Sequence, residues 1–239
     1  VLHHPYDVDR HLKHSFYRLY VASHRMCFIS YSIEVAGGRV ATHYKLPAMR
    51  YSDIVLTPSE RIRSNHLKYS KIRLNKERLL KSQHPYMYDV NSRLIRKNIV
   101  CDVFYSTHHS VDVVNDLCTF AKYGHIFYSL FRKHQQLKIL FRPHPLFLQK
   151  ISKNENFDLF KNIISLSNVT LSTKNDFIDD ILRCKRIITD VSSMIPVISS
   201  TKKDMLILTN AQFNAEDSVY THQEFTESVL EKFITEGEN

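Results

Sequence analysis

Two apolar runs in this chain end abruptly in residues that can bind anions. One is LKILFRPHP at residues 137–145, and the other is RIITDVSS at residues 186–193. A buried parallel strand delivers polar groups to the carboxyl edge of its sheet in this way, and ligands of open α/β sheets bind at that edge. Hydroxyls, backbone N–H groups at a helix start and positive side chains together suit a phosphate. The sequence therefore predicts a diphosphate cradle that contains Arg142, His144, Ser192 and Ser193.

His144 stands between two prolines, which restrict the backbone on either side of it. Such a histidine donates to a phosphate, acts as an acid toward a leaving nucleotide, or only caps a loop. Arg142 is expected to bind phosphate through its guanidinium, and a surface ion pair is the alternative. His108, His109 and Ser110 close an earlier apolar run and are expected to make further contacts to the same ligand. A zinc site is not expected there, because adjacent side chains point in different directions and no third ligand has a recognisable spacing.

Ser192 and Ser193 lack the flanking glycines of the G-x-S-x-G turn that presents a nucleophilic serine. We therefore expect their hydroxyls to bind phosphate and not to form a covalent intermediate. Asp190 precedes the two serines, and it is expected to orient phosphates, to cap the following helix or to assist a metal.

Four short motifs of this chain resemble the bacterial CDP-glycerol glycerophosphotransferase family, which builds teichoic acids and related capsule polymers. They are THHS at residues 107–110, RPHP at 142–145, TDVSS at 189–193 and TKKD at 201–204, the last where the family often has T-G-K-P. The resemblance implies a GT-B-like fold of two Rossmann-like domains with parallel sheets. It also implies a cytidine-diphosphate-type donor such as CDP-glycerol, no cofactor and no obligatory metal.

The sequence departs from that family where the family's catalytic base is expected. Many members have a His-Gly pair in the N-terminal half, but here the corresponding run reads FISYS at residues 28–32. Candidates for the base are Glu34, His43 and Tyr31, with His3 and His4 as another option. Val197 and Asp204 stand where an acidic residue and a proline are common, so the donor is also in question.

Composition is that of a soluble globular protein with an anionic partner. The chain has 239 residues, of which 43% are hydrophobic and 24% charged, and its formal net charge is +9. No apolar run reaches the roughly 18 residues of a membrane span, and no nucleic-acid-binding signature accompanies the charge. The four cysteines lie far apart, which favours buried thiols in a reducing cytoplasm. The expected location is the cytoplasm, attached peripherally to the inner face of the cell membrane.

Helical and strand patterns alternate along the chain, which predicts parallel sheets covered by helices. We expect part of an acceptor-side Rossmann-like domain at residues 1–72, with a missing portion before Val1, and a basic connection at 73–97. A donor-binding Rossmann-like domain follows at 98–239. Ser59 is expected to cap a helix that runs to about Tyr69, and the sequence THQE at 221–224 to start the last helix.

Three functions fit these patterns. The first is transfer of glycerol-phosphate, a related polyol-phosphate or a sugar from a CDP-activated donor to a lipid-linked or polymeric acceptor at an anionic membrane surface. The second is an ordinary nucleotide-sugar glycosyltransferase of capsule or lipopolysaccharide synthesis. The third is a non-catalytic module that binds a nucleotide or an anionic polymer, and the missing His-Gly pair favours it.

Overall fold

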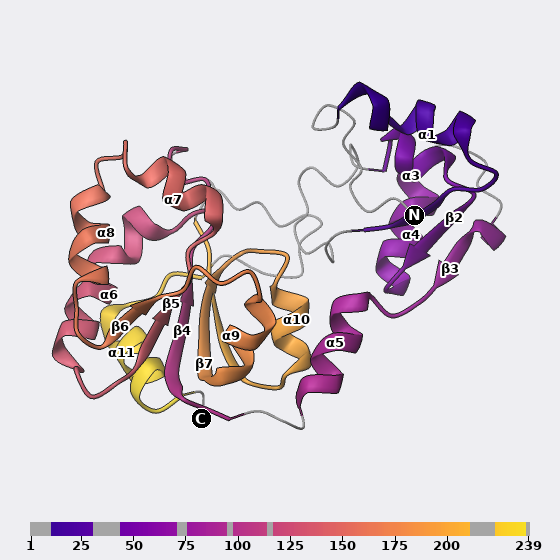
Figure 1. Cartoon of the computed structure of the whole chain (residues 1–239). Helices are drawn as coiled ribbons and strands as arrows, with labels where there is room; N and C mark the ends of the chain where they lie inside the picture. Colours follow the sequence, from indigo (N-terminus) through magenta and orange to yellow (C-terminus); the bar gives the residue numbers. More distant parts are fainter. Residues whose placement is uncertain are drawn as a thin grey trace. The chain divides into compact units, whose positions relative to one another are not determined.

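A computed structural model describes residues 11–30, 44–70, 76–94, 98–113, 117–210 and 223–237. The chain divides into two compact units, Val1–Tyr88 and Asp89–Asn239 (Figure 1). Each unit has its own parallel sheet and its own hydrophobic cluster, as the alternation of helix and strand patterns predicts.

The first unit contains a parallel sheet of order β1-β2-β3. Its strands are β1 (Cys27–Ile29), β2 (Ile54–Thr57) and β3 (Leu79–Lys81), and its other elements are η1 (Leu12–His14), α1 (Phe16–Ala22), α3 (Pro47–Tyr51), α4 (Glu60–Tyr69) and η2 (Lys76–Arg78). The predicted cap of α4 is confirmed, because Ser59 Oγ accepts a hydrogen bond from the Ile62 N–H at 3.3 Å. The helix α5 (Pro85–Arg93) includes residues of both units.

The stretch at 73–97, expected to be the basic connection between domains, contains regular secondary structure. It contains β3, which pairs with β2 so that Leu79 lies opposite Val55, and the whole of α5. Leu79 is buried whereas Leu80 is exposed. A three-residue strand with one buried side chain is too short to produce a hydrophobic period that sequence patterns detect.

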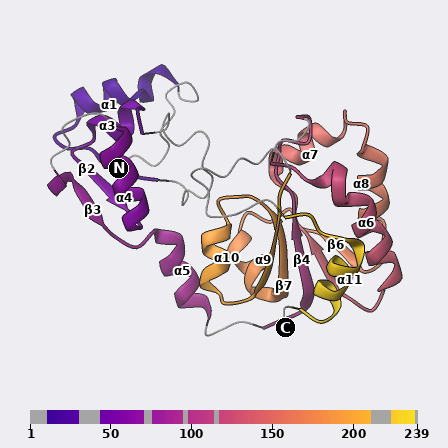
Figure 2. The ribbon, with the colours of Figure 1, turned by 180° about the vertical axis from the view of Figure 1, so that it is seen from behind.

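The second unit is built on a five-stranded parallel sheet of order β6-β5-β4-β7-β8. Its strands are β4 (Cys101–Ser106), β5 (Ile139–Phe141), β6 (Val169–Leu171), β7 (Cys184–Asp190) and β8 (Asp204–Leu208). Its helices are α6 (Phe120–Lys133), α7 (Pro145–Ile151), α8 (Phe157–Ile164), α9 (Phe177–Arg183), α10 (Ile195–Ser200) and α11 (Glu227–Thr235). The helices α6, α8 and α11 cover one face of the sheet, and α9 and α10 cover the other (Figures 1 and 2).

Alternation along β4 explains why both faces of this sheet are apolar. Tyr105 packs on one face with Phe127 of α6 and Phe141 of β5, at ring-centroid distances of 4.6 Å and 4.9 Å. Its neighbour Phe104 is also fully buried, and successive side chains of a strand point to opposite faces. On the first face, Gly124 lets α6 approach α8, since a Cβ there would lie 3.0 Å from the Leu159 side chain.

The last helix begins later than the sequence predicts. It starts at Glu227, and Thr226 Oγ1 accepts from the Val229 N–H at 3.4 Å, whereas Thr221 lies outside the described residues. Phe225 before the cap and Leu230 after it both join the main apolar cluster. This arrangement is a hydrophobic staple, and it places the helix start where two apolar side chains can be buried together.

Candidate functional site

The polar motifs of the second unit meet at the carboxyl edge of its sheet. Tyr105 of β4 lies opposite Phe141 of β5, and Ser106 lies opposite Thr189 of β7, so the three strands end side by side. The order continues past the strand ends, where the His144 N–H donates to the Thr107 carbonyl at 3.0 Å. This edge therefore carries residues 107–110, 142–145 and 190–193 on adjacent strand ends.

Three of the predicted site residues form an imidazole cluster at this edge. The ring centroids of His108 and His109 are 4.1 Å apart, and those of His109 and His144 are 4.9 Å apart. The rings of His108 and His144 are separated by 6.4 Å. His144 is exposed, while His108 and His109 are partly exposed. Imidazoles from two strand ends are therefore close enough to contact one small anion together.

His144 also caps α7. Its Nδ1 accepts a hydrogen bond from the Leu146 N–H at 3.1 Å, and Pro145 occupies the first turn of the helix. The pKa of His144 is lowered to about 4, mainly by desolvation and to a smaller extent by the nearby His109. The capping role that the sequence left open is thus present, and it coexists with an exposed ring at the sheet edge.

Asp190 is buried at the end of β7 and accepts several hydrogen bonds there. Its carboxylate accepts from the His108 N–H at 2.7 Å, from the Thr119 N–H at 3.2 Å and from the Thr119 hydroxyl at 2.5 Å. Desolvation raises the pKa of Asp190 to about 7, although these hydrogen bonds oppose the shift. Asp190 does not cap α10, whose N-cap is Met194 without a side-chain hydrogen bond. Its contacts instead fix the loop that carries the histidines.

The Arg142 guanidinium is held by protein acceptors. It donates to Asp180 Oδ2 at 2.6 Å, to Ser172 Oγ at 3.2 Å and to the Lys174 carbonyl at 2.6 Å. The Arg142 and Asp180 side chains are 12% and 1% exposed. These contacts make a largely buried ion pair that joins β5 to α9 and the loop before it. The structure thus gives Arg142 a structural role, while its expected contact with phosphate stays a prediction.

The two serines after β7 have different surroundings. Ser192 Oγ accepts from the Met194 N–H at 3.4 Å, and Ser193 is exposed. Ser110 supports the neighbouring histidine, because its hydroxyl lies 2.9 Å from His108 Nδ1. The exposed hydroxyl of Ser193 is accessible at the sheet edge.

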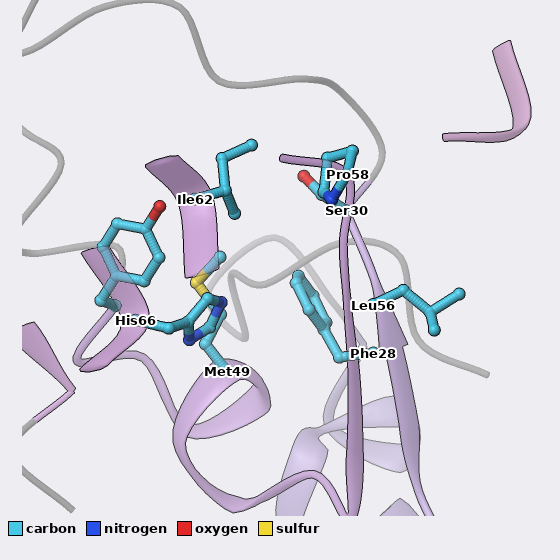
Figure 3. A pocket seen from close by; sticks show the side chains of 8 residues that line it. Phe28, Ser30, Met49, Leu56, Pro58, Ile62 and His66 are labelled. Atoms are coloured by element: carbon cyan, nitrogen blue, oxygen red, sulfur yellow. The ribbon is translucent and has the colours of Figure 1, made fainter. Parts of the chain in front are cut away.

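The candidates for a catalytic base, Glu34 and His43, lie outside the described residues, as does Tyr31. The carboxyl ends of β1 and β2 border a small cavity of about 20 Å³ (Figure 3). It is lined by Phe28, Ser30, Tyr44, Met49, Leu56, Pro58, Ile62 and His66. This volume is on the scale of a single water molecule and is far too small for a nucleotide.

His66 is a core histidine that the sequence analysis did not single out. It is buried, its ring meets the Tyr44 ring edge-on at 4.5 Å, and desolvation lowers its pKa to about 4. Its position four residues after Ile62, on the same face of α4, could have indicated from the sequence that His66 is buried. Asp180 gave a similar signal, since it falls among apolar residues of α9.

Two cations of the basic stretch have structural partners. Arg78 donates to the carbonyls of Tyr51, Ser52 and Asp53, and Arg93 pairs with Asp89 and Asp176. Within the described part of the chain, no helix is long and apolar enough to cross a membrane. Among the same residues, no group of three or more His, Cys, Asp or Glu side chains is arranged to hold a metal ion.

Comparison with known proteins finds structures of similar fold but no matching sequence family. No family model and no curated protein matches the chain. A structure of MnaA from S. aureus with UDP matches with a TM-score of 0.54 at 14% identity, over 80% of this chain and 52% of that one. UDP-GlcNAc 2-epimerase from Methanocaldococcus jannaschii, in complex with UDP-GlcNAc and UDP, matches with a TM-score of 0.52 at 15% identity, over 67% and 46%.

The wall teichoic acid polymerase TagF matches with a TM-score of 0.44 at 14% identity, over 75% of this chain and 48% of that one. The chain thus spans about half the length of these proteins. Likeness at such low identity shows the fold and does not single out the CDP-glycerol family. The chain has a GT-B-like α/β fold with two parallel sheets.

Proposed function

We propose that the chain is part of a GT-B-type transferase and that its second unit binds a nucleotide-activated donor. The observation that carries this proposal is the meeting of three imidazoles and an exposed serine at the carboxyl edge of one parallel sheet. Ligands of open α/β sheets bind at such an edge. Neutral donors and hydroxyls at this place suit the oxygens of a diphosphate.

We propose CDP-glycerol or a related CDP-polyol as the donor, because the chain shares motifs with the CDP-glycerol glycerophosphotransferase family. In the reaction, an acceptor hydroxyl attacks the β-phosphorus, a new O–P bond forms, and the bond to the α-phosphate oxygen breaks. CMP leaves with that electron pair, and the acceptor proton goes to a base, for which Glu34 and His43 are the candidates. His108, His109, His144 and Ser193 would stabilise the charge on the diphosphate, while Arg142 and Asp190 would hold the loops in place.

A nucleotide-sugar enzyme is the alternative, because structures of similar fold are described with UDP. Attack would then fall on the anomeric carbon, and a nucleoside diphosphate would leave. A binding module without catalysis remains the third candidate, since the His-Gly pair is absent.

Thermal denaturation with single nucleotides separates these candidates. A ligand at a hundred times its dissociation constant stabilises the folded state by about 2.7 kcal/mol, which is an easily measured shift. We expect CDP or CMP to raise the melting temperature, and a preference for UDP would favour the alternative. If no nucleotide changes the melting temperature, all the proposed nucleotide-dependent functions are contradicted.

Substitutions test the place of binding. His144→Ala and Ser193→Ala should each weaken the nucleotide effect and lower turnover at least about tenfold, or about 1.4 kcal/mol. His125→Ala is the matched control, because His125 is an exposed histidine of α6 that is not among the residues assigned to the site. Equal losses in the control variant would show that the effect is not local to the sheet edge.

The acceptor and the membrane also belong to the proposal. A lipid-linked polymer would bring the chain to an anionic surface, where each nearby Lys or Arg contributes about 1 kcal/mol. Lys81 is an exposed cation of the basic connection at 73–97, and Lys68 is an exposed cation of α4, which precedes it. Replacing both with Gln should reduce sedimentation with anionic vesicles at low salt, and equal sedimentation of wild type and variant would exclude them as the contact.

A further inference from the structure

Two imidazoles of the cluster use the same ring nitrogen to accept hydrogen bonds from the protein. His144 Nδ1 accepts from the Leu146 N–H at 3.1 Å. His108 Nδ1 accepts from the Ser110 N–H at 3.3 Å and lies 2.9 Å from the Ser110 hydroxyl. That hydroxyl oxygen already accepts from the Cys118 N–H at 3.2 Å, so its own proton is available to His108. Both Nδ1 atoms therefore face donors.

A nitrogen that accepts a hydrogen bond must carry a lone pair. A neutral imidazole has one N–H group, so in His108 and in His144 the proton resides on Nε2. Protonation of Nδ1 would place an N–H group against another donor and would break the helix cap at Leu146. The fold thus selects one tautomer for both rings, and it does so before any ligand binds.

A similar arrangement is found at the start of α5. His84 Nδ1 accepts from the Tyr86 N–H at 3.2 Å, and its Nε2 lies 2.9 Å from the Ser30 carbonyl oxygen. A carbonyl oxygen only accepts, so His84 Nε2 is a donor. His84 and His144 are each followed by a proline and a helix. In the first unit this arrangement therefore delivers a neutral Nε2–H donor to an oxygen atom.

We propose that His144 and His108 form a pair of neutral Nε2–H donors for the phosphate oxygens of the donor, and that neither transfers a proton. This inference rests on the proposed function and assigns the chemistry of its central residues. A neutral ring that gave up its Nε2 proton would become an anion. A protonated Nε2 also has no lone pair with which to accept a second proton. The leaving phosphate of CMP has a second pKa of about 6, so it departs near neutral pH without an acid.

The charged and titratable groups around the pair are consistent with neutral rings. His109 lies between them, and a positive charge there disfavours one on His144. Asp190 accepts the His108 backbone N–H, and Asp112 is paired with Lys150 at 2.8 Å. The pKa of His144 is lowered to about 4. Because His144 is also exposed, the hydrogen bond to its Nδ1 carries more weight than this shift.

Two substitutions of His144 separate donation from capping. In His144→Gln the side-chain amide N–H reaches approximately the position of Nε2, whereas in His144→Asn the polar atoms lie near the position of Nδ1 and can keep the cap. We expect the Gln variant to bind CDP within about threefold of wild type and the Asn variant to bind it at least tenfold more weakly, both being folded. Equal affinities for the two variants, or tighter binding by the Asn variant, would overturn the donor role.

Nuclear magnetic resonance of the histidine rings tests the tautomer without any ligand. Long-range ¹H–¹⁵N correlation of the full chain at pH 7 should show His108 and His144 as neutral Nε2–H rings, with assignments from single substitutions. A protonated Nδ1 in either ring would overturn the inference even if CDP binds. Failure of the wild-type protein to bind any nucleotide, with both rings neutral, would instead refute the proposed function and leave the tautomer assignment supported.

Discussion

Arg142 and Asp180 are 38 residues apart in the chain, yet their side chains form an ion pair next to the end of β5. The carboxylate of Asp180 is almost fully buried, and it also accepts from the Ser172 hydroxyl. A buried carboxylate that loses its cation is left with an uncompensated charge, which typically costs about 3–5 kcal/mol. The pair therefore links the loop after β5 to the folding of α9.

We expect Arg142→Met to lower the free energy of unfolding by about 3–5 kcal/mol in urea denaturation, because the buried Asp180 loses its cationic partner. The double variant Arg142→Met/Asp180→Leu should recover most of this loss, since it removes both charges. A single variant that is as stable as wild type but no longer binds nucleotide would show that Arg142 acts mainly on the ligand.

Asp190 makes stability depend on pH with a defined sign. Its folded-state pKa is raised from 3.8 to about 7 by burial, so between these values the folded state binds the additional proton. The contribution of Asp190 is therefore fully present below about pH 4 and is lost as the pH rises through about 7. His66 and His144 have lowered pKa values of about 4, and they act in the opposite direction between about pH 4 and 6.5.

The comparison of Asp190→Asn with wild type isolates this effect from the histidines. From pH 4.5 to 7.5, wild type should lose at least about 1.4 kcal/mol of unfolding free energy relative to the variant, the value of one pKa unit. Urea denaturation at the two pH values measures it. Parallel pH profiles for the two proteins would show that Asp190 ionises at its ordinary pKa.

At the scale of elements, two helices end in left-handed backbone with different residues. Lys202 follows α10 with φ of 54°, and Gly237 follows α11 with φ of 93°. An L residue in this region is strained by contact of Cβ with the backbone, whereas glycine is not. At Gly237 a Cβ would also collide with Asp204 Oδ2.

We expect Lys202→Gly to raise the free energy of unfolding by about 1 kcal/mol, because it relieves the strain. Lys202→Ala is the control, since it removes the charged side chain and keeps the Cβ. Gly237→Ala should destabilise by more than about 1 kcal/mol. If alanine and glycine at position 202 were equally stable in thermal denaturation, the gain would come from the lost charge and not from the backbone.

At the scale of the whole molecule, the described residues form a much larger hydrophobic cluster in the second unit than in the first. The cluster of the second unit includes α6, α7, α8 and α11 together with strands of a five-stranded sheet. The cluster of the first unit joins a three-stranded sheet to short helices. Smaller units bury a smaller fraction of their surface and are less stable on their own.

A fragment of residues 85–239, which keeps α5 whole, should therefore unfold cooperatively, whereas residues 1–84 should be much less stable. Circular dichroism during heating measures both. If the proposed function is right, the larger fragment should also retain the shift caused by CDP. A larger fragment without a cooperative transition would show that its core depends on the first unit.

Local patterns were enough to predict the parallel sheets, the cap at Ser59 and the arrival of RPHP and TDVSS at one sheet edge. These features depend on burial periodicity and on hydrogen bonds between residues close in sequence. Pro196 lies in the first turn of α10, where its missing N–H is tolerated.

Only the tertiary structure decided which partner each polar side chain has. Asp190 binds Thr119, 71 residues away, and Arg142 binds Asp180, while β3 joins its sheet through one buried leucine. The partner of a buried polar group depends on which elements become neighbours, and one sequence read alone does not contain that choice. The sequence by itself thus determined the sheets and the residues at their edge, and packing determined which of those residues are exposed there and which are held by protein partners.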